Sequence, residues 1–231
     1  PVGRRLKADV DKLLAHASRV EVRLSALSTA RPVLRVGVVD GGVFFLAQAL
    51  SRFRNVEPNV DVRVVCQRTR EQYDLLMQGN LDVAIVHGEQ APTALLKERL
   101  GLAVASDHPF VGSEWDLSDL QRETMIGPPT NRFSSTLSAW RNAFSAAGAG
   151  FDVHIEAAEP STVLQLVESG IGVALLTKSV VERAASSVVW LPLPLPLAIF
   201  VHTGVAVVEN AAPYVETFRE CLRQSVGELG Q

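Results

Sequence analysis

The sequence predicts an α/β protein with mainly parallel sheets, preceded by one long N-terminal helix. Two patterns carry this prediction. Apolar residues recur at alternating spacings of four and three near the N-terminus, and after Pro32 short β-branched runs alternate with helical runs. The composition agrees, because 47% of the 231 residues are hydrophobic and 20% are charged, which is too apolar for a disordered chain and too mixed for a fibre or a membrane protein.

The charge pattern gives no sign of a nucleic-acid or lipid surface. The chain has 22 Lys and Arg against 25 Asp and Glu, a net charge of −3, without a block of like charge. Its longest strongly apolar stretch, 188–201, is interrupted by prolines and cannot cross a bilayer as a helix. The chain begins without Met or an apolar leader, so we expect a processed chain or a fragment of a longer protein.

The first expected element is a helix with a heptad repeat. A narrow apolar seam of this kind favours dimerisation with a second helix over packing on the chain's own domain. The pattern breaks between Ser28 and Pro32, so residues 1–31 are expected to form a linker or dimerisation helix. The a and d positions are Leu6, Val10, Leu13, Ala17, Val20, Leu24 and Leu27.

Strands and helices are expected to alternate after Pro32. The strands are expected at about 33–39, 60–67, 83–87, 100–106, 124–127, 153–157, 172–176, 188–191 and 197–203. The helices are expected at about 43–55, 70–78, 135–147, 162–169, 179–185 and 213–226. Prolines at 192, 194 and 196 alternate with leucines, which fits an extended connector crossing between two subdomains.

The sequence contains no complete motif for catalysis, metal binding or cofactor binding. His154 and Glu156 have the H-x-E spacing of zinc deaminases, but no Cys-x-x-Cys follows. Gly170 and Gly172 resemble the start of a dinucleotide fingerprint but follow a helix rather than a strand. We therefore expect no metal, no cofactor and no enzyme. Cys66 and Cys221 are expected to be two buried thiols rather than a disulfide or redox switch.

Polar turns at strand ends are the best candidates for a small-molecule site. Asp40, Gly41 and Gly42 separate a strand from a helix, where backbone N–H groups can bind an anion or another polar group. Alternatively, Asp40 caps that helix with its own carboxylate, and both interpretations stay open. Further polar turns lie at 67–70, at 86–88 and at 130–134, although each alone is more often a solvated loop.

Short motifs run through the chain in a fixed order, and together they resemble one family. They are the turn at 1–6, the strand at 34–38, F…P-x-V-x-V over 53–62, G-x-L-D-x-A-I at 79–85, D-H-P-F at 107–110, and L-V-x-x-G-x-G-x-x-L over 166–175. With these motifs the chain resembles the linker helix and effector-binding domain of a LysR-type transcriptional regulator that lacks the winged helix-turn-helix. The last motif is the most specific to the family.

The resemblance implies a periplasmic-binding-protein-like fold, in which two crossing strands join two α/β subdomains around an effector cleft. Subdomain I would comprise 32–107 and 197–231, and subdomain II 108–196. Asp40 stands where the family commonly has Ser or Thr against an effector carboxylate, which mildly favours a cationic or hydroxyl-rich effector. The implied effector contacts are Asp40, Gly41, Gly42, Thr69, His87, Asn131, Arg132, Phe133, Ser161 and Thr162.

We therefore expect the regulatory part of a cytoplasmic transcription factor that forms a homodimer or homotetramer and binds DNA through a domain upstream of Pro1. Effector binding in the cleft would change the oligomer's geometry and so its promoter binding. One alternative is a periplasmic-type solute-binding protein for transport, which the heptad helix disfavours. Another is an enzyme on the same fold, for which His87 is the only candidate base.

Overall fold

The computed structural model describes residues 10, 20, 31–39, 42–88, 91–131, 133–184, 187–208 and 211–227. The chain forms two compact units: unit 1 is Pro1–Leu96 with His202–Gln231, and unit 2 is Lys97–Val201. The units divide within β4 (Thr93–Ala105) and β9 (Phe200–Val207). The predicted α/β class with two subdomains joined by two strands is therefore confirmed. The sequence placed the boundaries outside these strands, at 107/108 and 196/197, because a strand pattern does not show where one strand passes between two cores.

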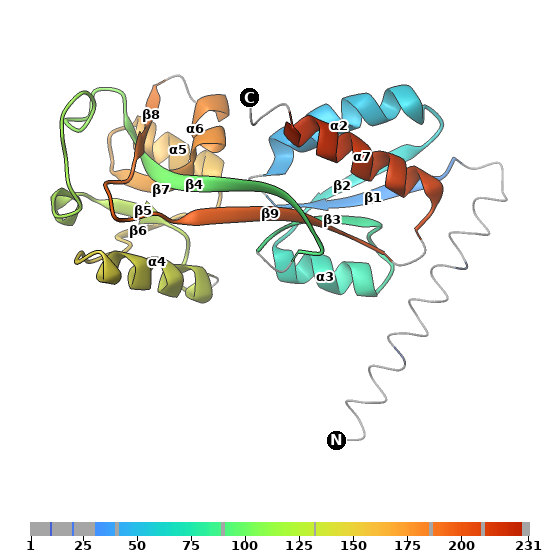
Figure 1. The fold of residues 1–231 in the computed structure, drawn as a ribbon, viewed down its shortest axis with the longest axis horizontal. Coiled ribbons are helices and arrows are strands. Elements are labelled where there is room, and N and C mark those ends of the chain that lie inside the picture. Colours follow the sequence, from blue (N-terminus) through green and yellow to red (C-terminus); the bar gives the residue numbers. More distant parts are fainter. Residues whose placement is uncertain are drawn as a thin grey trace. The chain divides into compact units, whose positions relative to one another are not determined.

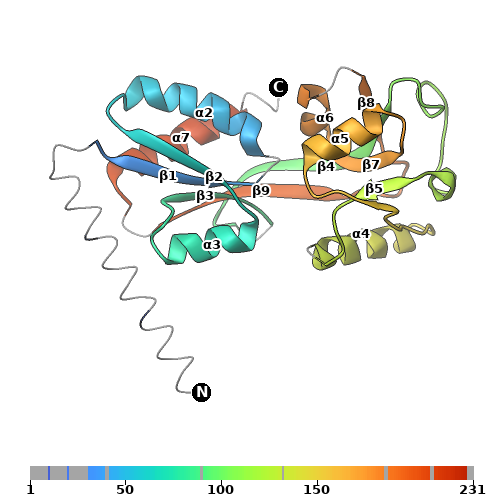
Figure 2. The same cartoon turned by 180° about the vertical axis from the view of Figure 1, so that it is seen from behind.

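Unit 1 is a sheet in the order β2-β1-β3-β9 with helices on both faces, α2 and α7 on one and α3 on the other (Figures 1 and 2). The first three strands are parallel, and β9 is antiparallel to β3. The elements are β1 (Val33–Val38), α2 (Val43–Val56), β2 (Asp61–Cys66), α3 (Thr69–Met77), β3 (Val83–His87) and α7 (Pro213–Gly227).

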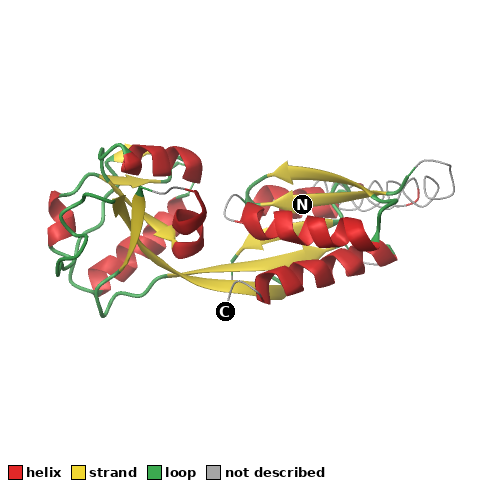
Figure 3. Ribbon diagram, turned by 90° about the horizontal axis from the view of Figure 1, so that it is seen from above, coloured by secondary structure: helices red, strands yellow, loops and turns green. Residues whose placement is uncertain are grey.

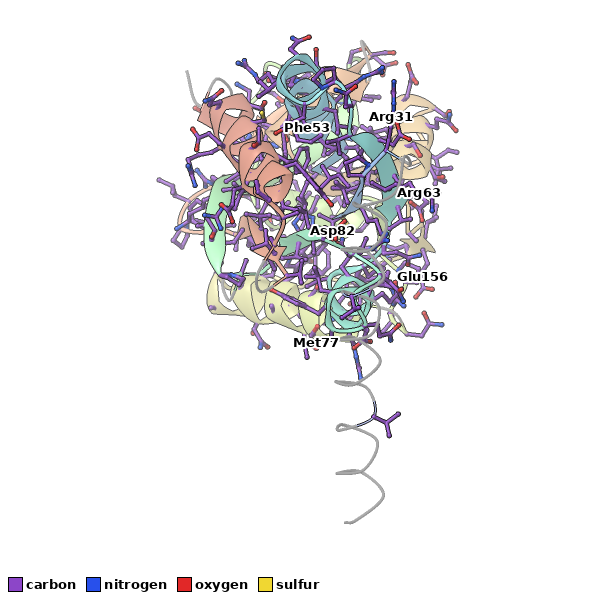
Figure 4. The ribbon with its side chains drawn as sticks, turned by 90° about the vertical axis from the view of Figure 1, so that its right-hand side faces the viewer. Arg31, Phe53, Arg63, Met77, Asp82 and Glu156 are labelled. Atoms are coloured by element: carbon purple, nitrogen blue, oxygen red, sulfur yellow. The ribbon has the colours of Figure 1, made fainter. Side chains whose placement is uncertain are left out.

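Alternate residues of β3 fill two cores in unit 1. Val83 and Ile85 belong to the cluster under α2 and α7, whereas Ala84 and Val86 belong to the cluster under α3. Helices α2 and α7 lie side by side (Figure 3), and Phe53 of α2, labelled in Figure 4, meets Phe218 of α7 edge to face at 5.4 Å. Both rings are fully buried, so this pair anchors the larger core.

Unit 2 is a sheet in the order β8-β4-β7-β5-β6, with α5 and α6 on one face and α4 on the other (Figure 1). β4 is antiparallel to β7 and β8, and β5 is parallel to β6 and β7. The elements are β5 (Met125–Gly127), α4 (Ser134–Ala146), β6 (Ile155–Glu156), α5 (Pro160–Glu168), β7 (Val173–Thr177), α6 (Lys178–Ala184) and β8 (Val188–Pro192).

Every expected strand and helix after Pro32 is present; β3 has the expected bounds, and the other elements have shifted ends. The largest shift is β4, which begins at Thr93 rather than at 100, because its early residues are only partly buried and lack a clear apolar alternation. A short 3-10 helix, η2 (Asp119–Arg122), was not expected. The predicted proline connector between subdomains is wrong. Residues 193–197 turn within unit 2, where Arg99 Nη2 donates to the carbonyl oxygens of Leu193 (3.0 Å) and Leu197 (2.9 Å).

The glycines behind two sequence motifs have structural causes. Gly79 follows α3 with φ of 72°, and Gly170 follows α5 with φ of 69°, the left-handed conformation that ends many helices. At Gly172, an added Cβ would lie 2.1 Å from the carbonyl oxygen of Thr124. Helix termination and close packing therefore explain the G-x-G segment without a nucleotide.

The expectation for the N-terminal helix stays open, and the expectation for the cysteines is wrong in part. The heptad helix lies outside the described residues except for Val10 and Val20, which are helical and 43% and 41% exposed, so its dimerisation stays a prediction. No disulfide joins the cysteines, but only Cys221 is buried. The expectation of a buried Cys66 is wrong, because β2 is an edge strand on which every residue except Val62 is exposed. Among the described helices, none has the length and hydropathy needed to span a membrane.

Candidate functional site

Three of the predicted turns follow β1, β2 and β3 at one edge of the sheet in unit 1. Their C-terminal ends meet because the three strands are adjacent and parallel. Asp40 and Gly41 lie outside the described residues. Gly42 is the N-cap residue of α2, without a side-chain cap, and its N–H donates to the carbonyl oxygen of Val39 (2.8 Å).

The structure joins Thr69 and His87, two of the predicted contacts. Thr69 Oγ1 accepts a hydrogen bond from the His87 N–H (3.0 Å) and donates one to the His87 carbonyl oxygen (3.2 Å). His87 Nδ1 lies 3.2 Å from Thr203 Oγ1, a buried hydroxyl on β9. Sequence reasoning missed Thr203. The only available signal was its place at the end of an expected strand, which does not show that this strand lies beside β3.

Two more side chains at this edge were missed. The Glu71 carboxylate accepts hydrogen bonds from the Arg68 backbone N–H (3.2 Å) and from Arg68 Nε (3.1 Å). This carboxylate raises the pKa of the exposed Arg68 guanidinium. Gln72 is fully buried, and its Nε2 donates to the carbonyl oxygens of Gln67 (2.7 Å) and Ile85 (3.0 Å). Both residues lie within the helix that follows β2, and the apolar spacing that predicted this helix does not single out its polar positions.

Most predicted contacts of unit 2 are exposed, as His87 is in unit 1. The Thr130 N–H donates to Glu156 Oε1 (3.0 Å), and this bond lowers the pKa of the exposed Glu156 carboxyl. Asn131 is exposed, Phe133 is half-buried before α4, and Arg132 lies outside the described residues. Ser161 and Thr162 are exposed in the first turn of α5.

The described groups suit hydrogen bonding to a small polar molecule. Hydroxyls, an imidazole and an exposed amide side chain can each donate or accept. Within the described ranges, no three His, Cys, Asp or Glu residues are grouped as metal ligands. A groove of about 560 Å³ lies between α2 and β2, but none of its lining residues is a predicted contact. The expectation that an effector occupies a cleft between the subdomains stays a prediction.

A family model described as the LysR substrate binding domain matches residues 27–227. The chain belongs to this family. The resemblance read from the short motifs is thereby confirmed, and the LysR substrate binding domain accounts for nearly the whole chain.

The relatives of this LysR substrate binding domain are transcriptional regulators. The HTH-type transcriptional regulator GltR of Bacillus subtilis (strain 168) is 25% identical over 132 residues, which cover 54% of the chain and 44% of GltR. CbbR of Xanthobacter flavus is 26% identical over 184 residues, 76% of the chain and 55% of CbbR. The chain thus spans about half the length of these relatives. They support a regulatory role and not the transport alternative.

Solved structures share the fold. Full-length BenM has a TM-score of 0.69 and is 25% identical. The match covers 100% of this chain and 79% of the BenM chain. The BenM effector binding domain with its effector benzoate has a TM-score of 0.68 at 24% identity, covering 86% of the chain and 93% of that domain. An OxyR mutant of Corynebacterium glutamicum has a TM-score of 0.70 at 21% identity, with 99% and 74% coverage.

Proposed function

We propose that this chain is the effector-sensing part of a LysR-type transcriptional regulator. The observation that carries the proposal is the family match over residues 27–227, which includes both units. The polar turns at the strand ends supply groups suited to a small ligand. In this proposal the chain has no catalytic role and needs no cofactor, and the whole protein acts in the cytoplasm, where it binds DNA.

Unit 1 contributes Thr69 and His87 to the effector contact, together with the turn at Asp40, Gly41 and Gly42. The Thr69 hydroxyl and the His87 backbone are already fixed against each other by two hydrogen bonds, so they lose little freedom when a ligand binds. Unit 2 contributes Asn131, Arg132, Phe133, Ser161 and Thr162.

The effector we propose is hydroxyl-rich or cationic rather than a simple carboxylate. Asp40 in the turn after β1 repels an anion unless it is neutralised. In unit 2 the Glu156 carboxylate already accepts the Thr130 N–H, a backbone donor that an anionic ligand would otherwise use.

We further propose that the protein works as a homodimer or homotetramer joined by the seam of Leu6, Val10, Leu13, Ala17, Val20, Leu24 and Leu27. A ligand then acts by favouring one arrangement of the oligomer, and only by as much as its affinities for the arrangements differ. Light scattering of the chain with and without residues 1–31 tests the seam, because the proposal expects a dimer or tetramer that dissociates when the helix is removed. A monomer in both cases would contradict it.

A screen of small polar metabolites by thermal denaturation tests effector sensing. We expect a neutral polyol or an amine to raise the melting temperature, and Thr69→Val to weaken this effect while Thr69→Ser, which keeps the hydroxyl, preserves it. If only carboxylates stabilise the chain, the proposed effector chemistry is wrong. If a stabilising ligand is equally effective on Thr69→Val, the proposed contact is wrong.

A further inference from the structure

Gln72 has an unusual position for a polar side chain. It lies in the first half of α3, and its residue is fully buried among the apolar side chains of unit 1. Its two amide N–H groups bond to two different strands. Nε2 donates to Gln67 O just after β2, and to Ile85 O in the middle of β3, the last β3 residue that pairs with β1. Burying an amide is costly unless such bonds are made, so the two N–H bonds hold this side chain in one place, although its Oε1 is buried without a hydrogen-bond partner among the described residues.

The strand β1 lies between the two strands that Gln72 connects, because the sheet order is β2-β1-β3. The side chain must therefore cross β1, and it does so at Gly37. A Cβ added to Gly37 would lie only 2.6 Å from Gln72 Oε1, 3.0 Å from its Cδ and 2.6 Å from Leu81 Cδ1. Glycine in a strand interior is otherwise unfavourable, and here it leaves room for the crossing amide.

The bonds to Gln72 extend the sheet where its own ladder stops. The last paired residues of β1 are Val38 with Cys66 and with Ile85. Beyond them, Gln67 N–H donates to Val38 O (3.0 Å) and Val39 N–H donates to Ile85 O (3.1 Å). Gln72 uses the Gln67 carbonyl and the second lone pair of the Ile85 carbonyl, so it joins the ends of β1 and β2 to the middle of β3 in one network.

We propose that Gln72 is a positioning residue whose amide crosses β1 over Gly37, ties the end of β2 to the middle of β3, and so sets the relative position of the turns carrying Gly42, Thr69 and His87. The same helix places Thr69 one turn before Gln72, against the backbone of His87. This role does not depend on which effector binds. It goes beyond the proposed function, because it concerns how the turns are held and not what they recognise.

Hydrogen exchange measured by NMR on the whole chain tests the proposal. In the unaltered protein, the side-chain amide protons of Gln72 should exchange much more slowly than those of exposed Gln48. In Gln72→Met, which keeps the side-chain length and removes both donors, the backbone amides of Val39, Gln67 and His87 should exchange at least about tenfold faster. Gly37→Ala, which displaces the amide by filling its path, should give the same local pattern.

Two control variants separate positioning from general stability. Ser225→Ala removes another buried polar group, whose hydroxyl donates only within α7 to Cys221 O (2.8 Å), and Leu222→Ala opens the core under α7. Both variants should change backbone amide exchange rates without a selective acceleration at Val39, Gln67 and His87. The proposal is overturned if Gln72→Met and Gly37→Ala accelerate exchange evenly throughout unit 1, or if neither changes it. Should Gln72→Met fail to fold, fast exchange of the Gln72 side-chain amide in the unaltered protein would still overturn it.

Discussion

The two units hold their predicted contact residues in different ways. In unit 1, two hydrogen bonds join Thr69 and His87, and the buried hydroxyl of Thr203 lies 3.2 Å from His87 Nδ1. In unit 2, Asn131, Ser161 and Thr162 are exposed, and the loop before α4 is tied to β6 by the exposed Glu156. Under the proposed function, unit 1 would therefore supply a preformed contact, and unit 2 would supply side chains that can adjust to a ligand.

This difference follows from how each sheet ends. The parallel strands β1, β2 and β3 lie side by side, and α3, which packs on one face of the sheet, begins shortly after the end of β2. In unit 2 the strands beside the predicted contacts are short, since β5 has three residues and β6 has two. A longer ladder fixes its turns more firmly, so specificity is expected to come mainly from unit 1 and adaptability from unit 2.

Loss of a core aromatic ring should have the largest effect and should show whether the units differ in stability. Phe53→Ala removes a fully buried ring from unit 1, and Phe144→Ala removes one from unit 2. Each should lower the free energy of unfolding by about 3–5 kcal/mol. The described tryptophans, Trp115, Trp140 and Trp190, all lie in unit 2. Urea unfolding followed by fluorescence should thus respond more to Phe144→Ala than to Phe53→Ala, and equal responses would mean that the units unfold together.

Removing the Thr69 hydroxyl of unit 1 should lower the free energy of unfolding more than removing the Thr162 hydroxyl of unit 2. Thr69→Val leaves the His87 N–H without its acceptor and should cost about 1 kcal/mol. Thr162→Val changes an exposed residue of unit 2 and should stay within about 0.5 kcal/mol of the unaltered chain. Chemical denaturation of both variants checks this, and equal losses would remove the contrast between the units.

The pH dependence of the free energy of unfolding should show the effect of burying the Asp82 carboxyl in unit 1. Asp82 Oδ2 accepts the Arg35 N–H (2.7 Å), and burial raises the Asp82 pKa despite that bond (labelled in Figure 4). A raised pKa stabilises the fold below the unfolded value, and this stability is lost as pH rises through the folded pKa. From acid to neutral pH, the unaltered chain should therefore lose stability relative to Asp82→Asn. A constant difference between the two proteins would contradict the raised pKa.

The smallest effect is expected in unit 2. The pKa of Glu156 is lowered by the Thr130 N–H, so its stabilising bond is present above the unfolded pKa and lost as pH falls through the folded value. Because Glu156 is exposed, Glu156→Gln should leave the denaturation midpoint at neutral pH unchanged, while carboxylate probes gain affinity. A large fall in the midpoint would show that this loop is as rigid as the turns of unit 1.

Most of the fold could be read from the sequence, because β-branched runs and helical apolar spacing report local burial. Thr69 and His87 could be proposed because both lie at strand ends. Gln72 and Thr203 could not, since their roles depend on which strands lie side by side, and sequence periodicity does not give that order. The prediction of a buried Cys66 failed for the same reason, because its apolar run is typical of a buried strand, whereas β2 is an edge strand.

The most direct test of the contrast between the units is native-state hydrogen exchange of the unaltered chain, resolved by residue. Our account predicts that the His87 amide exchanges more than about tenfold more slowly than the amides of Asn131 and Thr162. Thr69 accepts the His87 N–H, whereas Asn131 lies in the loop before α4 and the N–H of Thr162, in the first turn of α5, lacks an intrahelical acceptor. Equal exchange at all three amides would contradict the claim that unit 1 presents a preformed contact.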